Sequence, residues 1–154
     1  MKPLAARLLA QARIRGFSRV LLFALAALAG CSSIETPAGA TVTRTGETSN
    51  FRIEVSAPAA VNAGDLLKVN ATVTYIGDEP LVVHHGEPIV RFHFTGSDES
   101  RGYTDIGYAT EFRQGQTIEV EDTFEATKKG KRRLEIAVEE EVRVELEPIE
   151  IRVE

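Results

Sequence analysis

The chain has 154 residues, of which 43% are hydrophobic and 27% are charged, and its formal net charge is −5. Residues 1–30 hold five of the 18 Lys and Arg residues and no acid, so the rest of the chain carries 13 basic against 23 acidic side chains, a net charge near −10. This balance argues against nucleic acid as a partner and against a domain that lies on an anionic lipid surface. A single cysteine excludes an intramolecular disulfide, so the fold must depend on its hydrophobic core.

The first 30 residues have the parts of an export signal. The start is cationic, and the apolar run from Val20 to Ala29 follows it. This run of about ten residues is too short to remain as a membrane span, which needs roughly 20. We therefore expect residues 1–30 to be a signal segment that is removed.

The segment Leu28-Ala29-Gly30-Cys31 ends the apolar run with small residues and the only cysteine. It resembles the lipobox of bacterial lipoproteins and matches it at all four positions. The resemblance implies cleavage between Gly30 and Cys31 and diacylglycerol attached to the Cys31 sulfur, since a thiolate is a strong nucleophile. It also implies a protein anchored outside the cytoplasm, on the cell membrane or the outer membrane, with no cofactor except the lipid. The alternative is an ordinary secretory signal with an incidental cysteine.

Residues 31–49 are rich in Ser, Thr, Gly, Ala and Pro and show no sustained periodicity. We interpret them as a flexible linker, with a short edge strand at Val42–Thr45 as the alternative. A flexible chain of this length spans roughly 20–25 Å. Residues 50–154 are then long enough for one domain.

From Phe51 onward the apolar residues recur with a period of two, which is typical of strands. Turn residues separate the apolar runs every eight to twelve residues or so, the spacing of a β-sandwich. Pro148 shifts the apolar parity from even to odd positions, so we expect the last strand to lie at an edge. The expected fold is all-β, an antiparallel immunoglobulin-like sandwich of seven to eight strands. Its apolar runs are Phe51–Val55, Leu67–Tyr75, Leu81–Val83, Ile89–Phe94, Tyr108–Phe112, Ile118–Phe124, Leu134–Val138, Val142–Leu146 and Ile149–Val153.

Three segments, Ala71–Pro80, Gly130–Ile136 and Glu147–Val153, resemble those of bacterial immunoglobulin-like domains on exported lipoproteins. A more distant likeness is to the bacterial intracellular proteinase inhibitor domain, which is itself such a sandwich. Arg132 replaces the usual aromatic residue after the glycine turn, and the Cys and Trp of antibody domains are absent. The likeness therefore implies a fold and no functional residue.

The histidines His84, His85 and His93 fall within ten residues and are weak candidate ligands for zinc or copper. His84 and His85 point to opposite faces of an extended strand, so surface histidines are the favoured interpretation. No Gly-x-Ser-x-Gly elbow and no glycine-rich phosphate loop occurs. We therefore expect no catalytic residue and no enzymatic activity.

The favoured hypothesis is a non-enzymatic binding or accessory module for another exported protein. Its contacts are expected at the loop Gly96–Gly107 or at Glu139–Glu141, which the even-numbered apolar pattern of residues 134–146 places at the tip of a hairpin. One alternative is a protease inhibitor that uses an exposed loop. The other is a metal-binding protein that uses the three histidines.

Overall fold

The structure is a computed structural model that describes residues 39–99, 101–103 and 106–154. Every regular element in these residues is a β-strand, as the alternating pattern predicts. The described residues contain no helix that is long and apolar enough to cross a membrane. The strands are β1 (Thr41–Glu47), β2 (Phe51–Pro58), β3 (Ala60–Val61), β4 (Leu66–Tyr75), β5 (Leu81–His85), β6 (Val90–Phe94), β7 (Tyr108–Phe112), β8 (Thr117–Glu125), β9 (Gly130–Val138) and β10 (Ile149–Val153).

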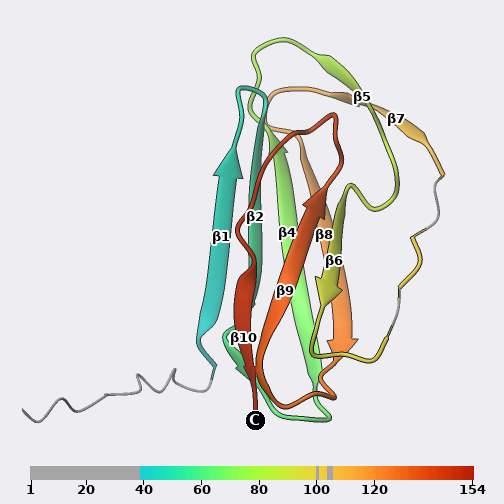
Figure 1. Cartoon of the computed structure of the whole chain (residues 1–154). Helices are drawn as coiled ribbons and strands as arrows, with labels where there is room; N and C mark the ends of the chain where they lie inside the picture. Colours follow the sequence, from blue (N-terminus) through green and yellow to red (C-terminus); the bar gives the residue numbers. More distant parts are fainter. Residues whose placement is uncertain (1–38, 100, 104–105) are drawn as a thin grey trace, which may run out of the picture. The chain divides into compact units, whose positions relative to one another are not determined.

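Two four-stranded sheets face each other, and a separate two-stranded ribbon lies beside them (Figure 1). One sheet has the order β1-β2-β4-β8 and is antiparallel throughout. The other has the order β3-β10-β9-β6, in which only the β3–β10 pair is parallel. The ribbon pairs β5 with β7. The predicted all-β immunoglobulin-like sandwich is confirmed, with ten strands instead of seven or eight.

The core lies between the two sheets and is made by the inward-facing residue of each alternating pair. Phe51, Ile53 and Val55 of β2 are at most 1% exposed, and the residues between them face solvent. Phe51 packs edge-on against Tyr75 and Phe112, with ring centroids 5.2 Å apart in both pairs. Phe112 belongs to β7, so this aromatic cluster fastens the β5–β7 ribbon to the sandwich.

The strand β1 corrects the linker expected at residues 31–49. Residues 41–47 pair with β2 along their whole length, so the alternative of an edge strand there is the right one, and it is longer than Val42–Thr45. Gly46 permits this strand, because a Cβ there would lie 2.7 Å from Val144 Cγ1 and 2.8 Å from the Glu145 carbonyl oxygen. The segment 143–148 therefore passes directly against β1.

The hairpin expected at residues 134–146 does not form. β9 ends at Val138, and a turn follows, in which the Val142 N–H donates to the Glu139 carbonyl over 3.0 Å. Val142, in this turn, and Val144, in the irregular segment 143–148 that follows it, are buried although they belong to no strand. The expected edge position of the last strand is also wrong, since β10 lies between β9 and the two residues of β3.

Candidate functional site

The outer edge of β8 is the most distinctive feature of the sandwich. In an immunoglobulin-like sandwich the fourth strand pairs with this edge. In that scheme β6 is the third strand, and the next strand, β7, should be the fourth. Here β7 pairs with β5 instead. Within the described residues β8 therefore has only β4 as a neighbouring strand.

The hydrogen bonds of β8 alternate between its two sides. The Tyr75 N–H on β4 donates to the Gln116 carbonyl over 2.9 Å, so the backbone N–H and C=O groups of even-numbered β8 residues point toward β4. Residues 118, 120, 122 and 124 then pair with β4 in the observed register. Thr117, Glu119, Glu121 and Thr123 consequently direct their backbone N–H and C=O groups away from β4.

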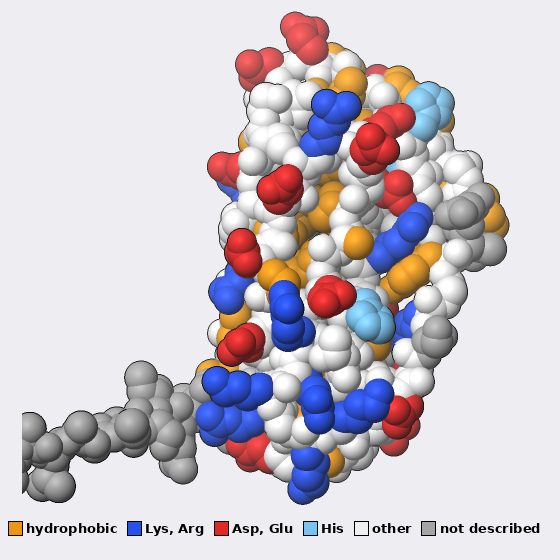
Figure 2. Space-filling model, viewed as in Figure 1, with side chains coloured by type: hydrophobic (Ala, Val, Ile, Leu, Met, Phe, Trp, Pro, Cys, Tyr) orange, Lys and Arg blue, Asp and Glu red, His pale blue; other side chains and the backbone are white. Residues whose placement is uncertain are grey.

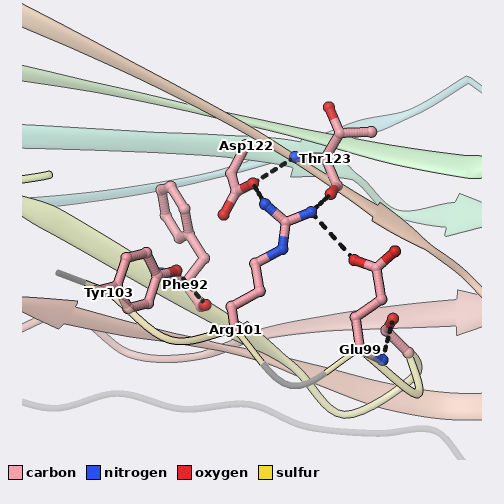
Figure 3. Close-up of polar contacts among 7 residues, drawn as sticks. Phe92, Glu99, Arg101, Tyr103, Asp122 and Thr123 are labelled. Carbon is pink, nitrogen blue, oxygen red and sulfur yellow. Dashed lines mark hydrogen bonds and ion pairs between the residues drawn. The ribbon is translucent and has the colours of Figure 1, made fainter.

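Arg101 closes one half of this outer edge (Figure 3). Its guanidinium donates to the Thr123 carbonyl and forms an ion pair with Asp122, whose side chain is only 12% exposed. A further ion pair with Glu99 spans 3.1 Å, and the guanidinium lies 4.7 Å from the ring centre of Phe124. Arg101 thus occupies the place where a strand from another protein would pair with Thr123.

Tyr103 closes the edge of the opposite sheet from the same loop. Its hydroxyl donates to the Phe92 carbonyl over 2.9 Å and accepts from the Phe92 N–H over 3.1 Å, so it satisfies both outward groups of this β6 residue (Figure 3). Arg91 stacks over the Tyr103 ring at 5.5 Å. The loop expected to contact a partner at Gly96–Gly107 therefore directs Arg101 and Tyr103 onto the sandwich itself.

The other half of the β8 edge is Thr117–Glu121, and its residues from Ile118 to Glu121 line a groove of about 410 Å³. The inner face of the β5–β7 ribbon forms one side, with His85, Tyr108 and Thr110. The half-buried side chains of Ile118 and Val120 supply apolar surface on the β8 side. The groove lining is completed by Glu87, Pro88, Ile89, Glu119 and Glu121.

The groove is acidic. Glu87, Glu119 and Glu121 are exposed at its margin, and no Lys or Arg belongs to its lining in the described chain. The Glu87 carboxylate, hydrogen-bonded to the Tyr108 hydroxyl, raises the pKa of Tyr108 above its usual value. Tyr108 is nevertheless 42% exposed, so its ring is accessible surface in the groove. The groove thus presents apolar and aromatic surface with a rim of carboxylates and an open strand edge.

The three histidines have different surroundings. His85 lies in the groove, where Nδ1 is 2.7 Å from the Gly86 carbonyl and Nε2 is 2.9 Å from Thr110 Oγ1, so both ring nitrogens already have partners. His84 and His93 are exposed, and His93 is opposite Glu135 across β6 and β9. No group of three or more His, Cys, Asp or Glu side chains is positioned to hold a metal ion in the part of the chain that the structure describes.

Of the remaining candidate positions, some make contacts within the domain and others lie outside the described residues. Glu139 and Glu141 make contacts within the domain: Glu139 pairs with Arg91 over 2.5 Å, and Glu141 accepts from the His84 N–H over 2.7 Å. Gly30 and Cys31 lie outside the described residues. The groove itself was not predicted from the sequence. The available signal was the alternation of Ile118 and Val120 with Glu119 and Glu121, but whether that strand has a free edge depends on where β7 pairs.

The fold and the groove define an all-β sandwich protein with an incompletely covered strand edge. No protein-family model and no curated protein matches the sequence. Among solved structures, the chain is similar to β-glucosidase from Listeria innocua in complexes with glucose, with gluconolactone and, for a mutant form, with laminaribiose. The sequence identities are 16%, 15% and 16%, the TM-score is 0.43 in each case, and the matches cover 70–71% of this chain. This chain spans only 16% of those enzymes, a likeness too distant to assign a function.

Proposed function

We propose that this protein is a lipid-anchored, extracytoplasmic, non-enzymatic module that binds an extended segment of another exported protein. The lipobox-like segment Leu28–Cys31 supports the anchor, with the lipid on Cys31. The observation that carries the binding role is the open edge of β8 at Thr117–Glu121 inside an acidic groove.

An extended segment can add to this edge as a further strand. Main-chain hydrogen bonds to Thr117, Glu119 and Glu121 would supply affinity, and side chains at alternate positions would supply specificity. The open edge, at about 3.3 Å per residue, accommodates a strand of roughly five residues. The Arg101 clamp at Thr123 sets the limit of pairing at one end.

The groove chemistry defines the segment it fits. Side chains directed toward Ile118 and Val120 should be apolar, because these two side chains are half-buried on the core side of β8. Side chains directed the other way would meet Glu119 and Glu121, which are exposed on the outer face. The matching pattern alternates Val or Ile with Lys or Arg, and opposite charges on neighbouring strands stabilise the pair.

A selection of displayed random heptapeptides on the processed protein tests this proposal. We expect enrichment of peptides that alternate branched apolar and basic residues. The double variant Glu119→Gln/Glu121→Gln should bind the selected peptide at least several-fold more weakly, because each carboxylate contributes a cross-strand charge pair of up to about 1 kcal/mol. The matched control Glu135→Gln/Glu150→Gln changes two exposed carboxylates on the other sheet and should leave binding unchanged.

N-methylation of the selected peptide separates strand pairing from simple charge attraction. In a paired strand only every second amide faces the partner strand. Methylation of one alternate set should abolish binding, and methylation of the other should leave it nearly intact. Equal binding of the two methylated peptides, or a selected peptide indifferent to the Glu119/Glu121 variant, contradicts the proposed site.

A further inference from the structure

A group of basic side chains gathers at one end of the sandwich, although the described domain is acidic overall. We call Lys129, Lys131, Arg133 and Arg152 the basic corner. Lys131 is directly opposite Arg152 in the β9–β10 pair, and Arg133 lies two residues further along β9. Figure 2 shows Lys and Arg side chains gathered at the lower end of the molecule, where β1 begins and the C-terminus lies in Figure 1.

The basic corner is not neutralised within the domain. Like charges directly opposite on neighbouring strands repel, so the Lys131–Arg152 pair has a local cost. In the described part of the chain, none of the four side chains is in an ion pair. The acids nearest along the two strands are Glu150, which is opposite Arg133, Glu135, two residues after Arg133, and Glu154, two residues after Arg152.

The N-terminal segment joins the domain beside the basic corner. The Ala59 N–H donates to the Ala40 carbonyl over 2.7 Å, and the next residue, Ala60, pairs with Arg152. Ala40, which directly precedes β1, is only nine positions after Cys31 in the sequence. A flexible chain of nine residues has a root-mean-square span of roughly 15–18 Å, and even fully extended it reaches only about 30 Å.

We propose that the basic corner faces and contacts the anionic phospholipid headgroups of the membrane that holds the lipid on Cys31. This inference rests on the proposed lipid anchor. The short tether keeps the domain within reach of the surface, and its attachment beside the basic corner presents that end to the bilayer. Each Lys or Arg near an anionic surface increases binding roughly fivefold, and this attraction acts only within about a Debye length of 10 Å.

The inference revises what the net charge alone indicated. A net charge near −10 argues against contact with anionic lipid, but Lys and Arg side chains gather at the lower end of the domain in Figure 2. The acidic groove lies at the Thr117 half of β8. The other end of that strand, where Glu125 pairs with Leu66 of β4, lies at the lower end of the domain in Figure 1, as the basic corner does. Headgroup contact at the basic corner therefore leaves the open part of β8 directed away from the lipid.

Fluorescence quenching from the bilayer surface tests this orientation. Because the chain has one cysteine and it carries the lipid in our proposal, a substituted cysteine becomes the only free thiol for a probe. Asn62→Cys labels the tether end, since Asn62 is exposed and follows the β3 residues that pair with β10. Gln114→Cys labels the turn before β8 at the other end. The processed protein is reconstituted into vesicles of phosphatidylcholine alone or with about 30% phosphatidylglycerol, with a quencher attached to the headgroups.

We expect phosphatidylglycerol to increase quenching of the Asn62 probe at least twofold and to leave the Gln114 probe unchanged. About 0.5 M salt should reverse the effect, because it shortens the Debye length. The variant Lys131→Gln/Arg133→Gln/Arg152→Gln should abolish it, and the control Arg44→Gln/Arg52→Gln/Arg113→Gln, with the same loss of charge, should retain it. A response that is absent, or equal in these two variants, overturns the inference.

The mass of the processed protein distinguishes the two possible failures. A Cys31 without lipid refutes the proposed anchor, and the headgroup contact with it. A lipidated protein whose probes ignore phosphatidylglycerol refutes the headgroup contact and leaves the anchor and the groove intact.

Discussion

Arg101 offers the sharpest test of how the sandwich covers its own edge. Arg101→Ala removes the ion pair with Asp122, the hydrogen bond to the Thr123 carbonyl and the contact with the Phe124 ring. The Arg101 side chain is 35% exposed and that of Asp122 is 12% exposed, so the pair is intermediate in burial. Exposed pairs contribute at most about 1 kcal/mol, and loss of one partner of a buried pair costs about 3–5 kcal/mol. We expect the free energy of unfolding to fall by about 2 kcal/mol.

Urea denaturation measures this loss of unfolding free energy directly. The same loss should lower Tm by about 6–10 °C for a domain of this size. The free energy of unfolding of Arg101→Lys should fall between those of wild type and Arg101→Ala, since lysine keeps the charge but lacks the planar guanidinium that reaches both acceptors. Light scattering should also show more self-association of Arg101→Ala, because the uncovered edge can pair with another copy. The control Arg113→Ala removes a pair whose arginine is 74% exposed and should cost less than about 0.5 kcal/mol. An Arg101→Ala protein as stable as that control refutes the argument.

Two further predictions concern other contacts. Gly46→Ala should destabilise the domain by about 1–3 kcal/mol, because the added methyl group would collide with Val144 and the Glu145 carbonyl, whereas Gly102→Ala, with no neighbour within 4 Å, should be nearly neutral in the same denaturation experiment. Hydrogen bonds from Lys128 and Thr127 lower the pKa of Asp98 below 3.8, so its contribution to stability is present above that pH and is lost as the pH falls through the lowered value. Asp98→Asn should accordingly reduce stability at pH 6, and this difference should shrink as the pH falls below 3.8; a difference that grows on acidification contradicts this.

The strands were predictable where the period-two pattern coincides with burial on one face. β2 and β4 alternate strictly, and their inward residues are in the core. The same pattern misleads at Val142 and Val144, which are buried by an irregular segment after a turn in which Arg143 has φ 56°. β1 was missed as a full strand because Val42 is its only large apolar residue and none of its seven residues is fully buried, so its pattern resembles a linker. Pairing with β2, not hydrophobicity, makes it a strand.

The candidate site was largely beyond the reach of the sequence. The pairing of β7 with β5 is a non-local choice, and it determines that β8 has an open edge. Nothing in the sequence of the loop at residues 96–107 distinguishes polar residues that face a partner from Arg101 and Tyr103, which satisfy backbone groups of two edge strands. The sequence favoured surface histidines; His84 and His93 are exposed, whereas His85 is half-buried in the groove, where the contact of its Nε2 depends on Thr110, 25 residues away in the chain.

The division of the β8 edge into a closed and an open half has a consequence for crowding. A protein confined to a surface meets copies of itself far more often than one dissolved in the same volume, so a fully open strand would invite side-by-side polymerisation. Arg101 shortens the available edge to five residues, Thr117–Glu121, and the two carboxylates of that stretch would repel the same stretch of a neighbouring copy. In the lipid-anchored state that we propose, the edge can therefore stay available to a basic extended segment while neighbouring copies of the protein remain separate.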